Sequence, residues 1–115
     1  MHFDEYLTLA MDTAVYPEHG TGSKLAVAYA SLGLAGEAGE LANKVKKLLR
    51  GDFDSQDDWM RRRDGIKKEL GGVLWYVAAV AREFGFSLDI TAMDNLDELA
   101  LRKERGTIKG DGDDR

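Results

Sequence analysis

Apolar residues recur along this chain at the spacing of one helix face. Between residues 2 and 15, Phe3, Tyr6, Leu7 and Ala10 follow the i, i+3, i+4, i+7 rule. Helical spacing returns in three later segments, and strand-like alternation is hard to find. The pattern therefore predicts an all-α chain with four helices, over about residues 2–15, 25–49, 57–84 and 88–105.

Polar and glycine-rich segments separate these predicted helices. Residues 16–24, YPEHGTGSK, hold the only proline and two glycines, so they predict a loop. Ser55 or Asp57 is placed to cap the third helix, and Ser87 to cap the fourth. Residues 106–115, GTIKGDGDDR, have no helical period and are expected to form an irregular tail. Together, the predicted helices and loops indicate a single domain close to a four-helix bundle.

Composition and charge narrow the classes of function. The 115 residues correspond to one domain, and an apolar content of 43% supports only a modest core, which favours a dimer or tetramer. The net charge of −5 argues against binding to a nucleic-acid polymer, which requires a basic surface. Apolar runs fall far below the roughly 20 residues of a membrane span. Neither a signal-peptide pattern nor any cysteine is found, so a cytoplasmic protein is expected.

The second predicted helix carries two acids and two bases on one face. Glu37 and Glu40 are three residues apart, and Lys44 and Lys47 continue the same stripe. Carboxylate oxygens suit a hard cation such as Mg²⁺, and a metal with nearby ammonium groups suits phosphates. The simpler interpretation is an i, i+4 pair between Glu40 and Lys44 on a solvated helix face.

The third predicted helix favours the metal-site interpretation over the solvated ion pair. Glu69 lies beside its apolar stripe, so side-by-side packing of the two helices would bring it to Glu37 and Glu40. Three converging carboxylates repel one another and require a cation, as in carboxylate metal sites within helical bundles. Gly71 and Gly72 follow directly, although glycine weakens a helix interior by up to about 1 kcal/mol.

The segments GLAGEAGELANKVKK and KKELGGVLWYVAAVAREFG together resemble the MazG-like nucleoside triphosphate pyrophosphohydrolases, part of the all-α NTP pyrophosphatase superfamily. The resemblance extends from about Tyr6 to Arg115. It implies hydrolysis of a nucleoside triphosphate to the monophosphate and pyrophosphate. In that reaction, water activated by Mg²⁺, or by Mn²⁺ in its place, attacks the α-phosphate.

The resemblance also implies a set of metal ligands, with one departure. The family motif is E-x-x-E on one helix and E-x-x-D on the next. Glu37, Glu40 and Glu69 match three positions, whereas Gly72 stands where the family has aspartate. Asp64 lies about 140° around the helix from Glu69 and is a poor replacement. These matches leave open a weakened three-glutamate enzyme, a site completed by another acid, and an impaired homologue that binds nucleotide or serves as a helical interaction module. A purely structural helical bundle is a further alternative.

Substrate contacts are implied for a second group of residues. Lys44, Lys47 and Arg102 are expected to counter the triphosphate charge. Asn95 and Arg102 match the pattern N-x-x-K-L-x-x-R, in which Glu98 replaces the lysine. Tyr76 either stacks on a base or belongs to the core. The tail residues Lys109 and Arg115 either approach phosphate or belong to a disordered chain end.

Three neighbouring features are assigned structural roles. Trp75 is expected to pack in the core or at a subunit contact, and Gly71 to allow close packing of helices. The run RRR at 61–63 is interpreted as a solvated face that pairs with Asp57 and Asp58 rather than as a polyphosphate clamp.

Overall fold

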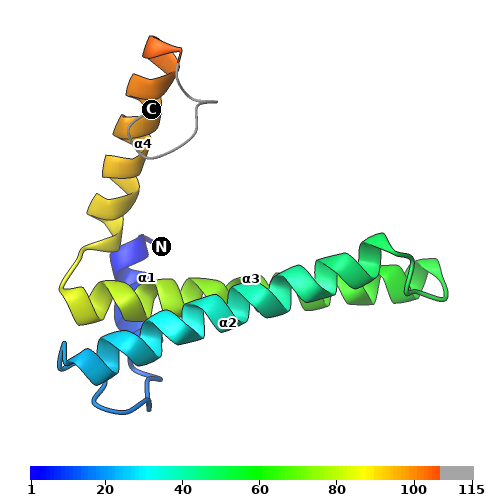
Figure 1. Cartoon of the computed structure of the whole chain (residues 1–115), viewed down its shortest axis with the longest axis horizontal. Helices are drawn as coiled ribbons and strands as arrows, with labels where there is room; N and C mark the ends of the chain where they lie inside the picture. The colour runs from blue at the N-terminus through cyan, green and yellow to red at the C-terminus, as the bar shows by residue number, and fades with distance from the viewer. Residues whose placement is uncertain (107–115) are drawn as a thin grey trace.

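The computed structural model describes residues 1–106, and these form four helices with no strand (Figure 1). The all-α prediction is therefore confirmed. No helix in this part of the chain combines the length and the apolar character needed to span a membrane. The helices are α1 (Phe3–Met11), α2 (Lys24–Leu49), α3 (Gln56–Phe84) and α4 (Leu88–Arg105).

Serine caps fix the starts of the three long helices. The hydroxyl oxygens of Ser23, Ser55 and Ser87 each accept a hydrogen bond at 3.1 Å from the backbone N–H three residues later. Ser55 rather than Asp57 caps α3. Gly85 ends α3 at a φ of 74°, a left-handed conformation in which glycine has no steric penalty. These local signals explain why the predicted limits of α2, α3 and α4 are correct to within one residue.

The predicted extent of the first helix is wrong at its C-terminal end, because α1 stops at Met11. Two turn hydrogen bonds replace the helix there, from the Thr13 N–H to the Ala10 carbonyl and from the Ala14 N–H to the Met11 carbonyl. The Thr13 hydroxyl also donates to the Ala10 carbonyl at 2.6 Å. Ala14 is buried without being helical, which is why the apolar spacing continues past the end of α1.

The four helices are arranged as a hairpin with two attached elements. α2 and α3 run side by side in opposite directions, and fully buried alanines, among them Ala26, Ala30 and Ala78, form their contact (Figure 1). α1 packs across α3, and α4 packs against α1 and then extends away from the hairpin. The Asp4 carboxylate fixes this junction by accepting the Leu88 N–H at 2.7 Å. Large apolar side chains stay exposed on all four helices, including Leu9, Leu32, Leu70 and Leu96.

The glycine that permits close helix packing is Gly33, not Gly71. A Cβ at Gly71 would meet nothing within 4 Å, so the packing role predicted for this residue is wrong. A Cβ at Gly33 would overlap the ring of Tyr76, which lies directly against the α2 backbone. Tyr76 is thereby fixed on the face of α3 that meets α2.

Gly33→Ala is expected to destabilise the protein. The added methyl group overpacks the contact with Tyr76, at a typical cost of about 1–3 kcal/mol, and this exceeds the gain in helix propensity. Gly36→Ala is the matched control, since a Cβ there meets nothing within 4 Å, and it should stabilise the protein by up to about 1 kcal/mol. Urea unfolding of both variants tests the contact, and equal stabilisation by both would contradict it.

Candidate metal and nucleotide site

Three glutamates come together where α2 and α3 pack side by side. Glu37 and Glu40 lie one turn apart on α2, and Glu69 lies on the facing part of α3. One carboxylate oxygen from each residue lies within 4.8 Å of the other two. The convergence that the sequence spacing predicted is therefore present. Both helices are long and capped, so the carboxylates are held on rigid elements.

The charges of this glutamate cluster are unevenly balanced. The pKa of Glu37 is raised by a hydrogen bond with Glu69, by burial and by the nearby charge of Glu40. The pKa of Glu69 is lowered, chiefly by its hydrogen bond with Lys44. Lys44 thus compensates the charge of Glu69, and the cost of ionising all three carboxylates falls mainly on Glu37. A bound cation would relieve this repulsion.

Lys44 connects the two helices across the edge of the cluster. Its Nζ donates to Glu69 Oε1 at 2.6 Å, and the Glu69 side chain is largely buried while that of Lys44 is half exposed. Within the described residues Lys44 forms no i, i+4 ion pair with Glu40, so the simpler interpretation of this stripe does not hold. Lys47 lies one turn further along α2, more distant from the acids than Lys44 is.

Gly72 faces directly into the glutamate cluster. A Cβ at this position would lie 2.7 Å from Oε2 and 3.0 Å from Cδ of Glu37. A side chain at position 72 would therefore share the space of these carboxylates. No fourth acidic or histidine side chain joins the cluster within residues 1–106. Asp64 is exposed and pairs with Arg63 at 3.6 Å.

An aromatic cavity of about 400 Å³ adjoins the cluster, with Glu37 and Gly72 in its wall. The rings of Tyr16 and Tyr29 stack at 5.5 Å, and Trp75 meets Tyr16 edge-on at 6.1 Å. Such rings offer apolar faces to a flat ligand. The other lining residues are Thr13, Val15, Pro17 and Tyr76.

Trp75 and Tyr76 combine packing with a place in this cavity. Both are partly buried against the core cluster, and their rings meet edge-on at 5.0 Å. The Trp75 indole N–H donates to the Thr13 hydroxyl at 2.9 Å. Tyr76 therefore packs on α2, as the core interpretation expects, and it also lines the cavity, while stacking on a base stays a prediction.

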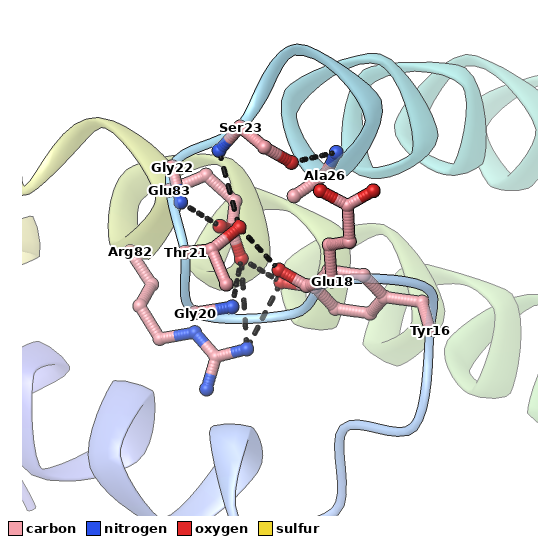
Figure 2. Close-up of polar contacts among 9 residues, drawn as sticks. All are labelled: Tyr16, Glu18, Gly20, Thr21, Gly22, Ser23, Ala26, Arg82 and Glu83. Atoms are coloured by element: carbon pink, nitrogen blue, oxygen red, sulfur yellow. Dashed lines mark hydrogen bonds and ion pairs between the residues drawn. The ribbon is translucent and has the colours of Figure 1, made fainter.

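Glu83 attaches the loop that carries Tyr16 to the end of α3 (Figure 2). Its buried carboxylate accepts hydrogen bonds from the Tyr16 hydroxyl, from the Gly20 N–H at 2.8 Å and from the Gly22 N–H at 2.9 Å. Arg82 adds a hydrogen bond from its guanidinium to the Tyr16 hydroxyl at 3.1 Å. Sequence reasoning did not single out Glu83 or Tyr29. The available signal was a single acid among the alanines at the end of a predicted apolar helix.

Glu83→Gln is expected to destabilise the protein by about 1–3 kcal/mol, the usual worth of hydrogen bonds to a buried charged group. Burial raises the pKa of Glu83, but the hydrogen bonds from Tyr16, Gly20 and Gly22 outweigh it and lower the pKa below 4.5. This stabilisation is therefore complete above about pH 4.5 and is lost as the pH falls through the folded-state pKa. Thermal unfolding at several pH values measures it, with the exposed Glu104→Gln as control. A stability difference between wild type and Glu83→Gln that does not shrink on acidification would contradict this role.

Residues predicted on the fourth helix do not reach the cluster within this chain. Asn95 is exposed beside an apolar cavity near the start of α4, and Arg102 donates to Glu98 at 3.2 Å. α4 leads away from the hairpin, so the chain's own fold does not bring these side chains to the glutamates (Figure 1). Lys109 and Arg115 lie outside the described residues.

These features define an all-α protein whose helical hairpin carries a carboxylate cluster between aromatic and basic side chains. The sequence profile of the MazG nucleotide pyrophosphohydrolase domain matches residues 28–106, and the chain belongs to this family. The family acts on nucleotides and typically uses a divalent metal. The chain is 46% identical over 116 residues to the Gene 37 protein of Mycobacterium phage L5, and the match covers the whole of both proteins. No solved structure matches it.

Proposed function

We propose that this protein hydrolyses nucleoside triphosphates to the monophosphate and pyrophosphate, with a divalent cation held by Glu37, Glu40 and Glu69. The observation that carries the proposal is their convergence, with oxygens within 4.8 Å of one another, next to an aromatic cavity and to Lys44. Aromatic faces suit a base, and carboxylates with nearby ammonium groups suit a metal–phosphate ligand. Membership of the MazG family supports the same assignment.

The donor set fits a hard divalent cation. All three side chains offer carboxylate oxygens, which Mg²⁺ and Mn²⁺ prefer. When bound, such an ion neutralises phosphate oxygens and lowers the pKa of a bound water.

The chain's own residues bind the base, orient the attacking water and compensate the charge of the triphosphate. The cavity formed by Tyr16, Tyr29, Trp75 and Tyr76 holds the base, and Glu37 stands where this cavity meets the cluster. One glutamate of the cluster orients the attacking water. Lys44 and Lys47 counter the charge of the triphosphate.

A second candidate function follows from Gly72. With three carboxylates where the family motif has four, the protein would bind a nucleotide and its metal without turning it over. This nucleotide-binding module would use the same cavity and the same cluster. The two functions differ only in whether pyrophosphate is released.

We also infer a cytoplasmic homo-oligomer, a dimer or tetramer, that binds no nucleic-acid polymer. Exposed apolar side chains on α2, α3 and α4, including Leu32, Leu70 and Leu96, support self-association. α4 extends away from its own hairpin, so Asn95 and Arg102 would serve the site of a neighbouring copy. The tail residues Lys109 and Arg115 are assigned the same role.

A pyrophosphate-release assay over ribo- and deoxyribonucleoside triphosphates tests the proposal. Release that requires Mg²⁺ or Mn²⁺ and stops with a chelator is expected. Thermal stabilisation by metal plus nucleotide without any release would favour the nucleotide-binding module. Absence of both effects would leave only a structural bundle and would contradict the proposal.

A further inference from the structure

A second cavity, basic rather than aromatic, lies along the hairpin on the other side of the glutamate cluster. It has a volume of about 300 Å³ and is formed by both long helices. Gly65 of α3 faces α2, and its lack of a side chain leaves space there for the cavity. Four cationic side chains complete the lining: Lys44, Lys47, Arg61 and Arg62.

The two cavities and the cluster follow one another along α2 and α3. On α2 the order is Tyr29, Glu37, Lys44 and Lys47, which covers about 27 Å at 1.5 Å per residue. α3 runs in the opposite direction, so Arg62 lies at the same end of the hairpin as Lys47. Lys44 joins the regions, because it lines the basic cavity and pairs with Glu69 at 2.6 Å. Along the hairpin, the aromatic cavity is therefore followed by the glutamate cluster and then by the basic cavity.

Asp58 holds the two arginines of this cavity in place. Its buried carboxylate accepts hydrogen bonds from Arg61, from Arg62 at 3.2 Å and from the Asp54 N–H at 3.1 Å. The hydrogen bond with Arg61, followed by those with Asp54 and Arg62, lowers the pKa of Asp58 to about 2. One carboxylate thus orients two guanidinium groups, and the charges of Asp52 and Asp54 also act on Arg62 and Arg61, respectively.

Several donors of the cavity remain available for an anion. A guanidinium carries five N–H groups in a planar fork, and its hydrogen bonds to Asp58 use only part of them. The Lys47 ammonium donates no hydrogen bond and forms no ion pair within the described range 1–106, although its backbone carbonyl accepts the Asp52 N–H. Arginine forks and lysine ammonium groups are the usual protein ligands of phosphate. The pairing with Asp58 expected for the run at 61–63 is confirmed for Arg61 and Arg62, which also stay exposed to solvent, whereas Arg63 pairs with Asp64.

We propose that this basic cavity binds the β- and γ-phosphates of the nucleoside triphosphate and then holds the pyrophosphate that leaves. The inference rests on the proposed function for the orientation of the nucleotide, with its base in the aromatic cavity and its α-phosphate at the glutamates. Water adds to the α-phosphorus, the bond from that phosphorus to the bridging oxygen breaks, and pyrophosphate departs into the basic cavity. The protein therefore selects triphosphates over monophosphates through its arginines.

Binding of inorganic tripolyphosphate, measured by calorimetry without divalent metal and at low ionic strength, tests the cavity directly. Arg61→Gln and Arg62→Gln should each weaken binding by about 10-fold, the loss of one charge-assisted contact. Single substitutions leave one arginine on Asp58, and circular dichroism checks that each variant is folded. Arg63→Gln is the control, because it removes the same charge from a residue that pairs with Asp64 and does not line the cavity. Equal weakening in all three variants, or in none, would overturn the proposal.

Steady-state kinetics separates this inference from the proposed function. If the chain hydrolyses nucleotides, the Arg61 and Arg62 variants should raise KM for the triphosphate and weaken product inhibition by pyrophosphate about 10-fold. Hydrolysis with unchanged KM in both variants would overturn the cavity assignment alone. A chain that releases no pyrophosphate but still binds tripolyphosphate through Arg61 and Arg62 would support the cavity while refuting the enzyme.

Discussion

Glu37→Gln abolishes metal-dependent nucleotide hydrolysis if the glutamate cluster is the metal site. The substitution removes one of three charged carboxylates whose oxygens lie within 4.8 Å of one another. Loss of a partner that merely orients a metal ligand already costs about 10–100-fold in affinity or activity, so removal of a ligand should cost at least as much. Mn²⁺ binding followed by electron paramagnetic resonance and pyrophosphate release are the two measurements.

The same variant should be at least as stable as the wild type when metal is absent. Glu37 is held beside Glu40 and Glu69, and its raised pKa reflects the cost of ionising it there. The uncharged amide removes that repulsion. Asp64→Asn removes a charge from an exposed acid outside the cluster and should leave both metal affinity and activity unchanged. Loss of stability without loss of metal binding would show that Glu37 is structural.

Gly72→Asp strengthens metal binding by at least about 10-fold, because it supplies a fourth carboxylate. The Cβ at this position points at Glu37, 2.7 Å from Oε2. The Glu37 carboxylate is the far end of a flexible side chain and can move aside. Pyrophosphate release should rise with metal affinity. Activity that is absent in the wild type and present in Gly72→Asp would identify the natural protein as a nucleotide-binding homologue.

Gly71→Asp is the control for this gain. It adds the same charge one residue earlier, at an exposed position where a Cβ meets nothing within 4 Å. Both substitutions replace glycine in the interior of α3, so their effects on helix propensity are similar. Equal metal affinity in the two variants would show that position 72 is no ligand position.

The elements of the fold could be predicted largely because their signals are local. Ser55 and Ser87 cap helices through their own side chains, and Gly85 ends one through its own backbone. The end of α1 was missed because Ala14 is buried by tertiary contacts after the helix has ended. The spacing of apolar residues indicates which residues are buried, and buried residues can continue past the end of a helix into a turn.

The candidate site could be predicted in part, for a similar reason. The positions of Glu37 and Glu40 on one helix face follow from their spacing, and Glu69 needs only the packing of two adjacent helices. The partner of Lys44 could not be predicted, since Glu40 and Glu69 were both in reach. Glu83 was not recognised because its partner Tyr16 is 67 residues away in sequence.

The position of bond cleavage tests the proposed chemistry most directly. A nucleoside triphosphate is incubated with the protein and Mg²⁺ in water enriched in the heavy oxygen isotope, and the products are weighed by mass spectrometry. Attack at the α-phosphate predicts label in the nucleoside monophosphate, none in the pyrophosphate, and no products with Glu37→Gln. Label in pyrophosphate or orthophosphate, or products that persist in Glu37→Gln, would contradict it.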